Sequence, residues 1–325
     1  HSPIALVGGA TGLIGDPSGR VDERSLNDTD VVHSWVERLS MQVSRFIDLD
    51  GSYGAKVVNN LEWTSSLDAL GFLRDIGKHF SVSAMMQRDS VKNRLGREGE
   101  GISYTEFSYM LLQAYDFLEL FRRHQCTIQV GGSDQWGNMV SGIDLIRRLD
   151  GQQAFVLTVP LITRSDGLKF GKTAEGTIWL DSDMTSPYRF YQFWLNTSDE
   201  DVASFLGYFT FLDSNDLAEA ASQARDRPGE RAAQRLLARE VTLLAHGHEA
   251  LSSAERITDA LFAGDVADLK QEDLNQLRLD GMDSTSVTNE EELLSALVRA
   301  DLAKSRGAGR RLIDGKGVQM NGKLV

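Results

Sequence analysis

Residues 4–20 read IALVGGATGLIGDPSGR, a short apolar run followed by glycines that recur every third residue from Gly9. This glycine spacing is typical of a dinucleotide-binding turn, which also needs a helix and then a second strand about 20 residues further on. Here Asp16 and Pro17 follow at once, and proline interrupts a helix. Residues 25–30 are polar, so the second strand does not follow. The stretch therefore predicts a strand-end loop whose backbone approaches a ligand other than NAD.

Outward from this loop, short apolar strands alternate with helical patterns. The predicted strands are residues 3–7, 55–59 and 126–130, and the predicted helices are residues 30–46, 66–76, 104–120 and 138–149. This alternation predicts an α/β fold, with a Rossmann-like parallel sheet over residues 1–185.

The pattern changes after Pro187, where nearly every segment has a helical period and is rich in Ala, Leu, Glu and Arg. Residues 230–246 are the clearest example. We expect an α-helical domain over residues 186–285, followed by a third part over residues 286–325 that combines an amphipathic helix with a basic segment.

Composition limits the class of protein. The chain has 325 residues, enough for two or three domains, and a single cysteine, Cys126, which excludes an internal disulfide framework and a multi-cysteine zinc site. No apolar run is long enough to cross a membrane, and cysteine usage favours the cytoplasm. The net charge of −13 argues against a broadly basic nucleic-acid-binding surface, although local basic patches such as residues 306–311 are present.

Three polar residues share one face of the predicted helix over residues 104–120. Tyr109, Gln113 and Asp116 lie at positions i, i+4 and i+7, and their neighbours are mostly apolar. A helix this apolar is mostly buried, so its polar stripe must be satisfied inside the protein. Two interpretations are open: a pocket wall that binds a small polar ligand, or an internal hydrogen-bond network.

Two further stretches indicate ligand contacts. Residues 129–137, QVGGSDQWG, follow a strand, where open α/β sheets bind ligands, and their tandem glycines let a ligand approach the backbone. Residues 166–173, DGLKFGKT, place two lysines around a glycine, which suits a polyphosphate, although surface loops often carry two lysines.

Taken together and in this order, these stretches resemble the bacterial tyrosyl-tRNA synthetases of the class I aminoacyl-tRNA synthetases. The matching blocks are residues 6–17, 72–81, 105–117, 131–137, 169–173 and 185–194. Residues 304–313 and 318–322 resemble the start of an S4-like RNA-binding module, a locally basic appendage through which an acidic protein could meet tRNA.

The resemblance implies a role for each matching position. The expected tyrosine-binding residues are Asp16, Tyr109, Gln113, Asp116, Gln135 and Asn60, with Asp116 accepting from the phenolic hydroxyl and Asn60 supporting Gln113. The expected ATP-binding residues are Gly132, Asp134, Gln129 and Lys172. The catalytic residues implied are Lys169, Lys172, Thr173, Arg20 and Arg24, which would stabilise the phosphates. Arg306, Arg310 and Arg311 would contact RNA.

The resemblance also implies substrates and partners: ATP as a substrate with Mg²⁺ carried on it, L-tyrosine, tRNA(Tyr), and a second copy of the chain bound through residues 72–80. It implies no NAD, no resident metal and no membrane. The family's first strand and HIGH signature precede Pro3 and the S4-like module stops partway, so we expect a fragment with impaired tyrosine activation. The alternatives are a tryptophanyl-type synthetase and a non-catalytic RNA-binding paralogue.

Overall fold

The structure is a computed structural model and is described where its residues are well placed. These residues are 2–14, 28–88, 91–92, 102–165, 167, 170–173, 176–262, 266–286, 292–320 and 323–325, with the side chains of residues 172, 173 and 176 outside the description. The chain divides into two compact units, residues 1–162 and residues 163–325. Each unit is described by itself.

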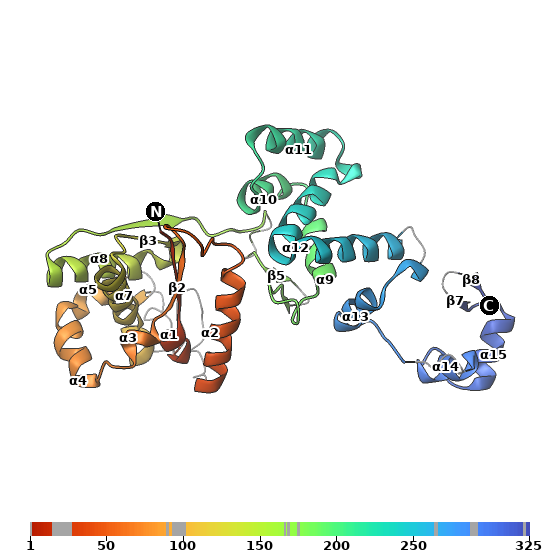
Figure 1. The fold of residues 1–325 in the computed structure, drawn as a ribbon, viewed down its shortest axis with the longest axis horizontal. Coiled ribbons are helices and arrows are strands. Elements are labelled where there is room, and N and C mark those ends of the chain that lie inside the picture. The colour runs from red at the N-terminus through yellow and green to blue at the C-terminus, as the bar shows by residue number, and fades with distance from the viewer. Residues whose placement is uncertain are drawn as a thin grey trace. The chain divides into compact units, whose positions relative to one another are not determined.

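The first unit contains two pairs of parallel strands (Figure 1). In the first pair, β1 (Ile4–Val7) lies beside β2 (Lys56–Asn59), and Val7 is opposite Asn59. In the second pair, β3 (Ile128–Gly132) lies beside β4 (Phe155–Val159). Because both pairs are parallel, the carboxyl ends of the two strands in each pair lie at the same edge.

Helices and single turns connect these strands. They are α1 (Gly9–Ile14), α2 (Thr29–Val43), α3 (Leu61–Thr64), α4 (Ala69–Gly71), a π-helical turn (Phe72–Ile76), a 3₁₀ turn (Gly77–His79), α5 (Val82–Met86), α7 (Tyr104–His124), a 3₁₀ turn (Ser133–Gln135) and α8 (Trp136–Asp150). Local signals bound the longest of them: the Ser103 hydroxyl caps α7 by accepting from the amide of Glu106, and Gln125 ends that helix in a left-handed conformation.

Helix α7 is the central packing element of this unit. Its buried Phe117 and Leu118 pack with Leu145 and Ile146 of α8, and Leu120 packs with Trp63 and the β1–β2 pair. Helices α7 and α8 approach closely at Gly142, where an added Cβ would lie 2.8 Å from Cδ1 of Phe117. Helix α7 therefore packs against both α8 and the β1–β2 pair.

The second strand pair leaves one face exposed. Alternate apolar residues of β3 and β4 are each more than half exposed, namely Ile128, Val130, Phe155, Leu157 and Val159. Side chains that point the other way, such as Val156, pack against the core of α7 and α8. Alternation of this kind is the period-2 pattern of a strand.

The predicted elements agree with the structure in kind, and their bounds differ by a few residues. The α/β fold with parallel strands is confirmed, and the predicted strand at 126–130 lies at 128–132. Within the described residues, the predicted loop after β1 is a short helix, α1, over Gly9–Ile14. The prediction missed β4, although FVLTV is a short, mostly apolar run with three β-branched residues. The predicted helix at 66–76 is a series of single turns.

The second unit is mainly helical. After the two-stranded hairpin of β5 (Lys172–Thr173) and β6 (Gly176–Thr177), it contains α9 (Pro187–Leu195), α10 (Val202–Phe209), α11 (Ser214–Asp226), a 3₁₀ turn (Pro228–Glu230), α12 (Ala232–Phe262), a 3₁₀ turn (Val266–Asp268) and α13 (Gln271–Leu279). Helix α12 packs along α9 and is kinked at Gly247, whose φ of 82° is not helical.

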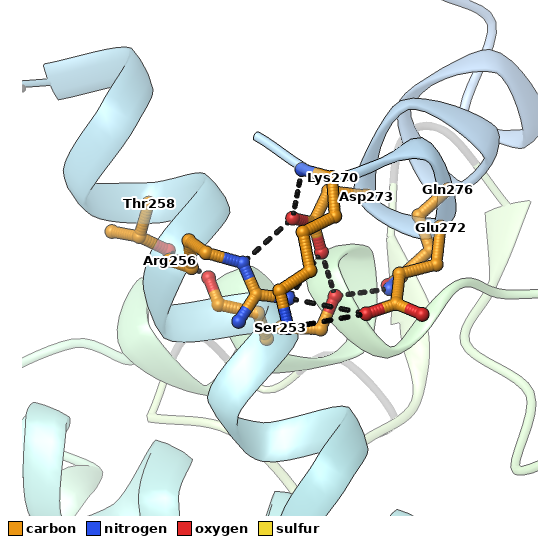
Figure 2. A network of polar contacts seen from close by, with 8 residues as sticks. Ser253, Arg256, Thr258, Lys270, Glu272, Asp273 and Gln276 are labelled. Atoms are coloured by element: carbon orange, nitrogen blue, oxygen red, sulfur yellow. Dashed lines mark hydrogen bonds and ion pairs between the residues drawn. The ribbon is translucent and has the colours of Figure 1, made fainter. Parts of the chain in front are cut away.

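A buried ion pair joins α12 to α13. The Asp273 side chain is fully buried and receives two hydrogen bonds from Arg256, through Nε at 2.7 Å and Nη2 at 2.8 Å (Figure 2). It also accepts from the Ser253 hydroxyl and from the amide of Lys270. These hydrogen bonds hold the pKa of Asp273 down at about 2, although burial alone would raise it.

The end of the chain forms a small separate core. Helices α14 (Leu293–Arg299) and α15 (Arg306–Asp314) pack around Leu297, Ala303 and Val318, and the hairpin of β7 (Gln319–Met320) and β8 (Lys323–Leu324) follows Val318. Of the helices in the described ranges, none is both long and apolar enough to cross a membrane.

Candidate active site

Two adjacent asparagines at the end of β2 hold the start of α1. Oδ1 of Asn59 accepts from the amide of Gly9 at 3.2 Å, and Oδ1 of Asn60 accepts from the amide of Ala10 at 2.7 Å. A Cβ on Gly9 would lie 2.3 Å from Oδ1 of Asn59, so any larger residue would displace the Asn59 carboxamide. These two side chains therefore occupy the amides of Gly9 and Ala10 at the start of α1.

The same Asn60 contacts Asp116 on α7. Its Nδ2 donates to Oδ2 of Asp116 at 3.0 Å and to the hydroxyl of Thr11 at 3.1 Å. Trp63 Nε1 donates to the other carboxylate oxygen, Oδ1, at 2.7 Å. Asp116 is 4% exposed, and Asn60 and Trp63 are almost fully buried. The carboxylate is therefore fixed on both oxygens by side chains of β2 and α3.

The chemistry of Asp116 is set by this burial. Desolvation raises its pKa from 3.8 to about 6, the hydrogen bonds from Asn60 and Trp63 oppose the shift, and nearby Glu119 adds to it. Each carboxylate oxygen has two lone pairs, and the two donors use one on each oxygen. Above pH 6 the group is a buried acceptor that can receive a further hydrogen bond from a ligand hydroxyl.

A second polar group lies where α7 meets α8. Asn138 Nδ2 donates to Oε1 of Gln113 at 2.8 Å and to Oε1 of Gln135 at 3.3 Å. The structure therefore brings Gln113 and Gln135 together through Asn138. The prediction that Asn60 supports Gln113 is replaced: Asn60 supports Asp116, and Asn138 supports Gln113. Tyr109, one turn before Gln113, is buried on the same helix.

The predicted ATP-binding residues lie in and after β3. Gly132 ends the strand, and an added Cβ there would lie 2.6 Å from Oδ1 of Asp134. The absence of a side chain at Gly132 therefore lets the Asp134 carboxylate lie close to the backbone. Asp134 is exposed and accepts from Nε2 of Gln135 at 3.3 Å. Within the described residues, the buried Oε1 of Gln129 has no hydrogen-bond partner.

Several predicted residues cannot be placed beside these groups. Asp16, Arg20, Arg24 and Lys169 lie outside the described residues, and for Lys172 and Thr173 the description gives the backbone of β5 alone. In the last part of the chain, Arg306, Arg310 and Arg311 are exposed on α15, and Arg306 forms an ion pair with Glu292.

Sequence reasoning missed four residues that build the site: Thr11, Asn59, Trp63 and Asn138. Two signals were available. A pair of asparagines directly after a buried strand is a polar interruption at the ligand-binding edge of a sheet. A tryptophan three residues later, in a short helix, needs a partner for its indole N–H when it is buried. The Asn138 contact depends on how α7 meets α8 and has no local sequence signal.

A family described as "tRNA synthetases class I (W and Y)" matches residues 1–263. A tyrosine–tRNA ligase of Aliivibrio fischeri is 54% identical over 327 residues, which cover 100% of this chain and 77% of that protein. A relative of the same name in Neisseria meningitidis is 51% identical, with 99% of this chain and 75% of that protein covered.

Solved structures give the same picture. A C-terminally truncated mitochondrial tyrosyl-tRNA synthetase of Aspergillus nidulans superimposes with a TM-score of 0.70 and 31% identity, over 80% of this chain and 77% of that one. A tyrosyl-tRNA synthetase of Archaeoglobus fulgidus, complexed with L-tyrosine, has a TM-score of 0.51 at 15% identity, with 77% of this chain and 79% of that one covered. The second likeness concerns the fold alone.

Proposed function

Because the chain belongs to the family of class I tRNA synthetases for tryptophan and tyrosine, we propose that it ligates L-tyrosine to tRNA(Tyr) with ATP as the second substrate. Relatives at 51–54% identity are tyrosine–tRNA ligases, which favours tyrosine over tryptophan. The single structural observation that carries the proposal is the buried Asp116 carboxylate, because a fixed acceptor suits the hydroxyl of tyrosine, which phenylalanine lacks. A carboxylate also accepts from an indole N–H, as it does from Trp63, so the choice of tyrosine over tryptophan rests on the relatives.

The tyrosine pocket is built around α7. Asp116 accepts from the phenolic hydroxyl, while Asn60 and Trp63 keep its oxygens in place. Tyr109, Gln113 and Asp16 hold the α-ammonium group at the other end of the substrate. In this proposal Asn138 sets the orientation of both Gln113 and Gln135, since it donates to each of them.

Activation is a single in-line displacement. A carboxylate oxygen of tyrosine attacks the α-phosphorus of ATP, the bond from that phosphorus to the bridging oxygen breaks, and pyrophosphate leaves with the electron pair. No covalent link to the enzyme forms. Gln135 orients the attacking carboxylate, and Gly132, Asp134 and Gln129 hold the nucleoside. The positive groups that stabilise the phosphates are Lys169, Lys172, Arg20 and Arg24, assisted by Thr173.

Mg²⁺ bound to ATP would neutralise charge on the phosphates. Among the described side chains, no group of three or more His, Cys, Asp or Glu could hold a metal ion. The tyrosyl group then passes to a ribose hydroxyl of the tRNA, and AMP leaves. We assign tRNA contacts to the exposed Arg306, Arg310 and Arg311 of α15.

The remaining features of the proposal concern organisation. We retain the division into a catalytic domain (1–185), a helical domain (186–285) and an S4-like module (286–325), and we place the enzyme in the cytoplasm.

A homodimer is supported by apolar side chains around residues 70–104 that are more than half exposed, namely Leu70, Leu73, Val82 and Tyr104. Sedimentation equilibrium of Leu70→Glu/Leu73→Glu tests it, since a wild-type-like dimer in that variant would contradict this interface.

Isothermal titration with tyrosine and phenylalanine, with ATP–pyrophosphate exchange, tests the function. We expect wild-type protein to bind tyrosine in preference to phenylalanine, and Asp116→Ala to lose the preference. Leaving the buried acceptor unsatisfied costs phenylalanine about 1–3 kcal/mol or more, a factor of about 5 to 150. A protein that binds RNA but gives no heat with tyrosine would support the non-catalytic paralogue instead, and preferential tryptophan binding would support a tryptophanyl enzyme.

A further inference from the structure

The segment that carries Lys169 and Lys172 is attached to the helical unit at two described points, Ser165 and Phe170. That unit begins at Thr163. Ser165 precedes the segment and Phe170 lies between the two lysines. The proposed function assigns phosphate stabilisation to these lysines, so what fixes their backbone bears directly on the reaction.

Phe170 is inserted into an aromatic cluster of α9 and α10. Its ring centroid lies 4.9 Å from that of Phe209 in a stacked arrangement and 5.1 Å from that of Phe205, edge to face. Trp194 and Phe193 are at 5.3 Å and 5.7 Å. Spacings of 4.5–7 Å are those of favourable aromatic pairs. One side chain of the lysine segment thus contacts four rings of the helical unit.

Asp201, which precedes α10, holds the start of the segment. Its Oδ1 accepts from the amide of Ser165 at 2.8 Å, and its Oδ2 accepts from the hydroxyls of Ser165 at 3.2 Å and Ser198 at 2.8 Å. The residue is 8% exposed. A buried carboxylate that receives three hydrogen bonds fixes the backbone of its donors firmly.

Backbone geometry explains why anchors are needed here. Gly167 and Gly171 have φ values of 79° and 80°, a left-handed conformation that glycine adopts at little cost but that also leaves the chain conformationally permissive. Phe170 immediately precedes the second of these glycines. From Gly171 the chain enters β5, and the Gly171 carbonyl accepts from the amide of Ile178 at 3.3 Å, which closes the hairpin. The direction of β5 therefore follows from how Phe170 and Gly171 are held.

We propose that Phe170 and Asp201 are positioning residues for the reaction. They fix the lysine-bearing segment to the N-terminal part of the helical unit and so set the position of the Lys172 backbone, from which its side chain extends. Neither residue needs to touch a substrate. The inference rests on the proposed function for its catalytic consequence, but the anchoring itself does not.

The kinetic test uses ATP–pyrophosphate exchange in the full-length protein. Phe170→Ala should lower kcat by about tenfold to a hundredfold, because small misplacements of positioned groups have effects of that size. The dissociation constant for tyrosine should stay unchanged, since the pocket lies in the other unit. Phe170→Leu should recover most of kcat by refilling the aromatic cluster. The matched control is Phe211→Ala, because Phe211 is 90% exposed in the same unit. It should leave kcat unchanged.

Asp201→Ala should resemble Phe170→Ala in kcat and in tyrosine affinity. Equal losses of tyrosine affinity and kcat in either variant would indicate general damage to the protein and would overturn a positioning role. An unchanged kcat in Phe170→Ala, with wild-type exchange measurable, would overturn it as well.

Limited trypsin digestion of residues 1–325 decides the anchoring independently of activity. We expect cleavage after Lys169 and Lys172 to become at least about tenfold faster in Phe170→Ala and Asp201→Ala, and not in Phe211→Ala. The rates are compared with each protein equally far below its own thermal unfolding midpoint. Unchanged cleavage would refute the anchoring. Absence of exchange in wild-type protein would instead count against the proposed function, so the two failures are distinguishable.

Discussion

Replacing Asp116 by asparagine should make the stability of the protein depend differently on pH. In the folded protein burial raises the pKa of this carboxyl from 3.8 to about 6. The native state therefore binds the proton more tightly than the unfolded chain does, so the stability that the group contributes is complete below pH 3.8 and is lost as the pH rises through 6. Asparagine has the same shape and does not titrate.

The magnitude follows from the shift in pKa. A difference of about 2.2 pH units at 1.36 kcal/mol each corresponds to about 3 kcal/mol of stability that the wild-type protein loses, relative to Asp116→Asn, between pH 3 and pH 8. About half of this change falls between pH 5 and pH 8. In the variant, the N–H group of the new carboxamide also faces the Nδ2 donor of Asn60. Two donors that face each other cost about 1–3 kcal/mol of stability, and this cost does not vary with pH.

Urea unfolding of the wild-type protein and Asp116→Asn from pH 3 to pH 8 measures the difference in their free energies of unfolding. The contributions of the other titrating groups cancel in this difference. Asp150→Asn is a control of opposite sign, because the hydrogen bond from Arg122 lowers the pKa of Asp150 and wild-type protein should gain stability over that variant as the pH rises. A difference between wild type and Asp116→Asn that is flat from pH 3 to pH 8 would refute the reasoning from burial.

Three further predictions concern the same packing. Trp63→Phe removes the N–H that stabilises the carboxylate of Asp116, so the pH at which tyrosine affinity is half-maximal should rise above about 6. Titration calorimetry at several pH values measures this, and it would show no rise if the indole were only a packing group. Gly142→Ala should cost about 1–3 kcal/mol in urea unfolding, because its Cβ would overlap Phe117, and a neutral result would mean that α7 and α8 separate easily. Asp273→Ala should cost about 1–3 kcal/mol, because the Ser253 hydroxyl and the Lys270 amide lose a buried acceptor while Arg256 keeps its ion pair with Glu272 (Figure 2), and thermal unfolding close to the wild-type midpoint would contradict this.

Much of the fold could be predicted because its signals are local. The apolar run before Gly8, the helical period over residues 104–120 and the polar stripe on that helix are each visible within a few residues. Helix α7 accordingly lies close to its predicted bounds. Strand β4 was missed because a five-residue, mostly apolar run is a weak signal without knowledge of its partner strand, β3.

The site was predictable in its residue types and less so in its contacts. Helical spacing placed Tyr109, Gln113 and Asp116 on one face, and the structure keeps them on α7. Which asparagine supports which of them depends on the distance between elements that are 50 or so residues apart in sequence, such as Asn60 and Asp116. Such pairings arise from tertiary packing, and no local pattern encodes them.

The way Asp116 is held limits how the amino-acid specificity of this enzyme could be redesigned. A library that varies Asp116 alone removes the acceptor of two buried donors, Asn60 Nδ2 and Trp63 Nε1, and most of its members would pay for those orphaned groups before any new substrate is bound. Asn60 is still harder to replace, because its carboxamide oxygen accepts from the amide of Ala10 while its nitrogen donates to both Asp116 and Thr11. An engineered pocket for another side chain should therefore randomise Asn60, Trp63 and Asp116 as a single unit.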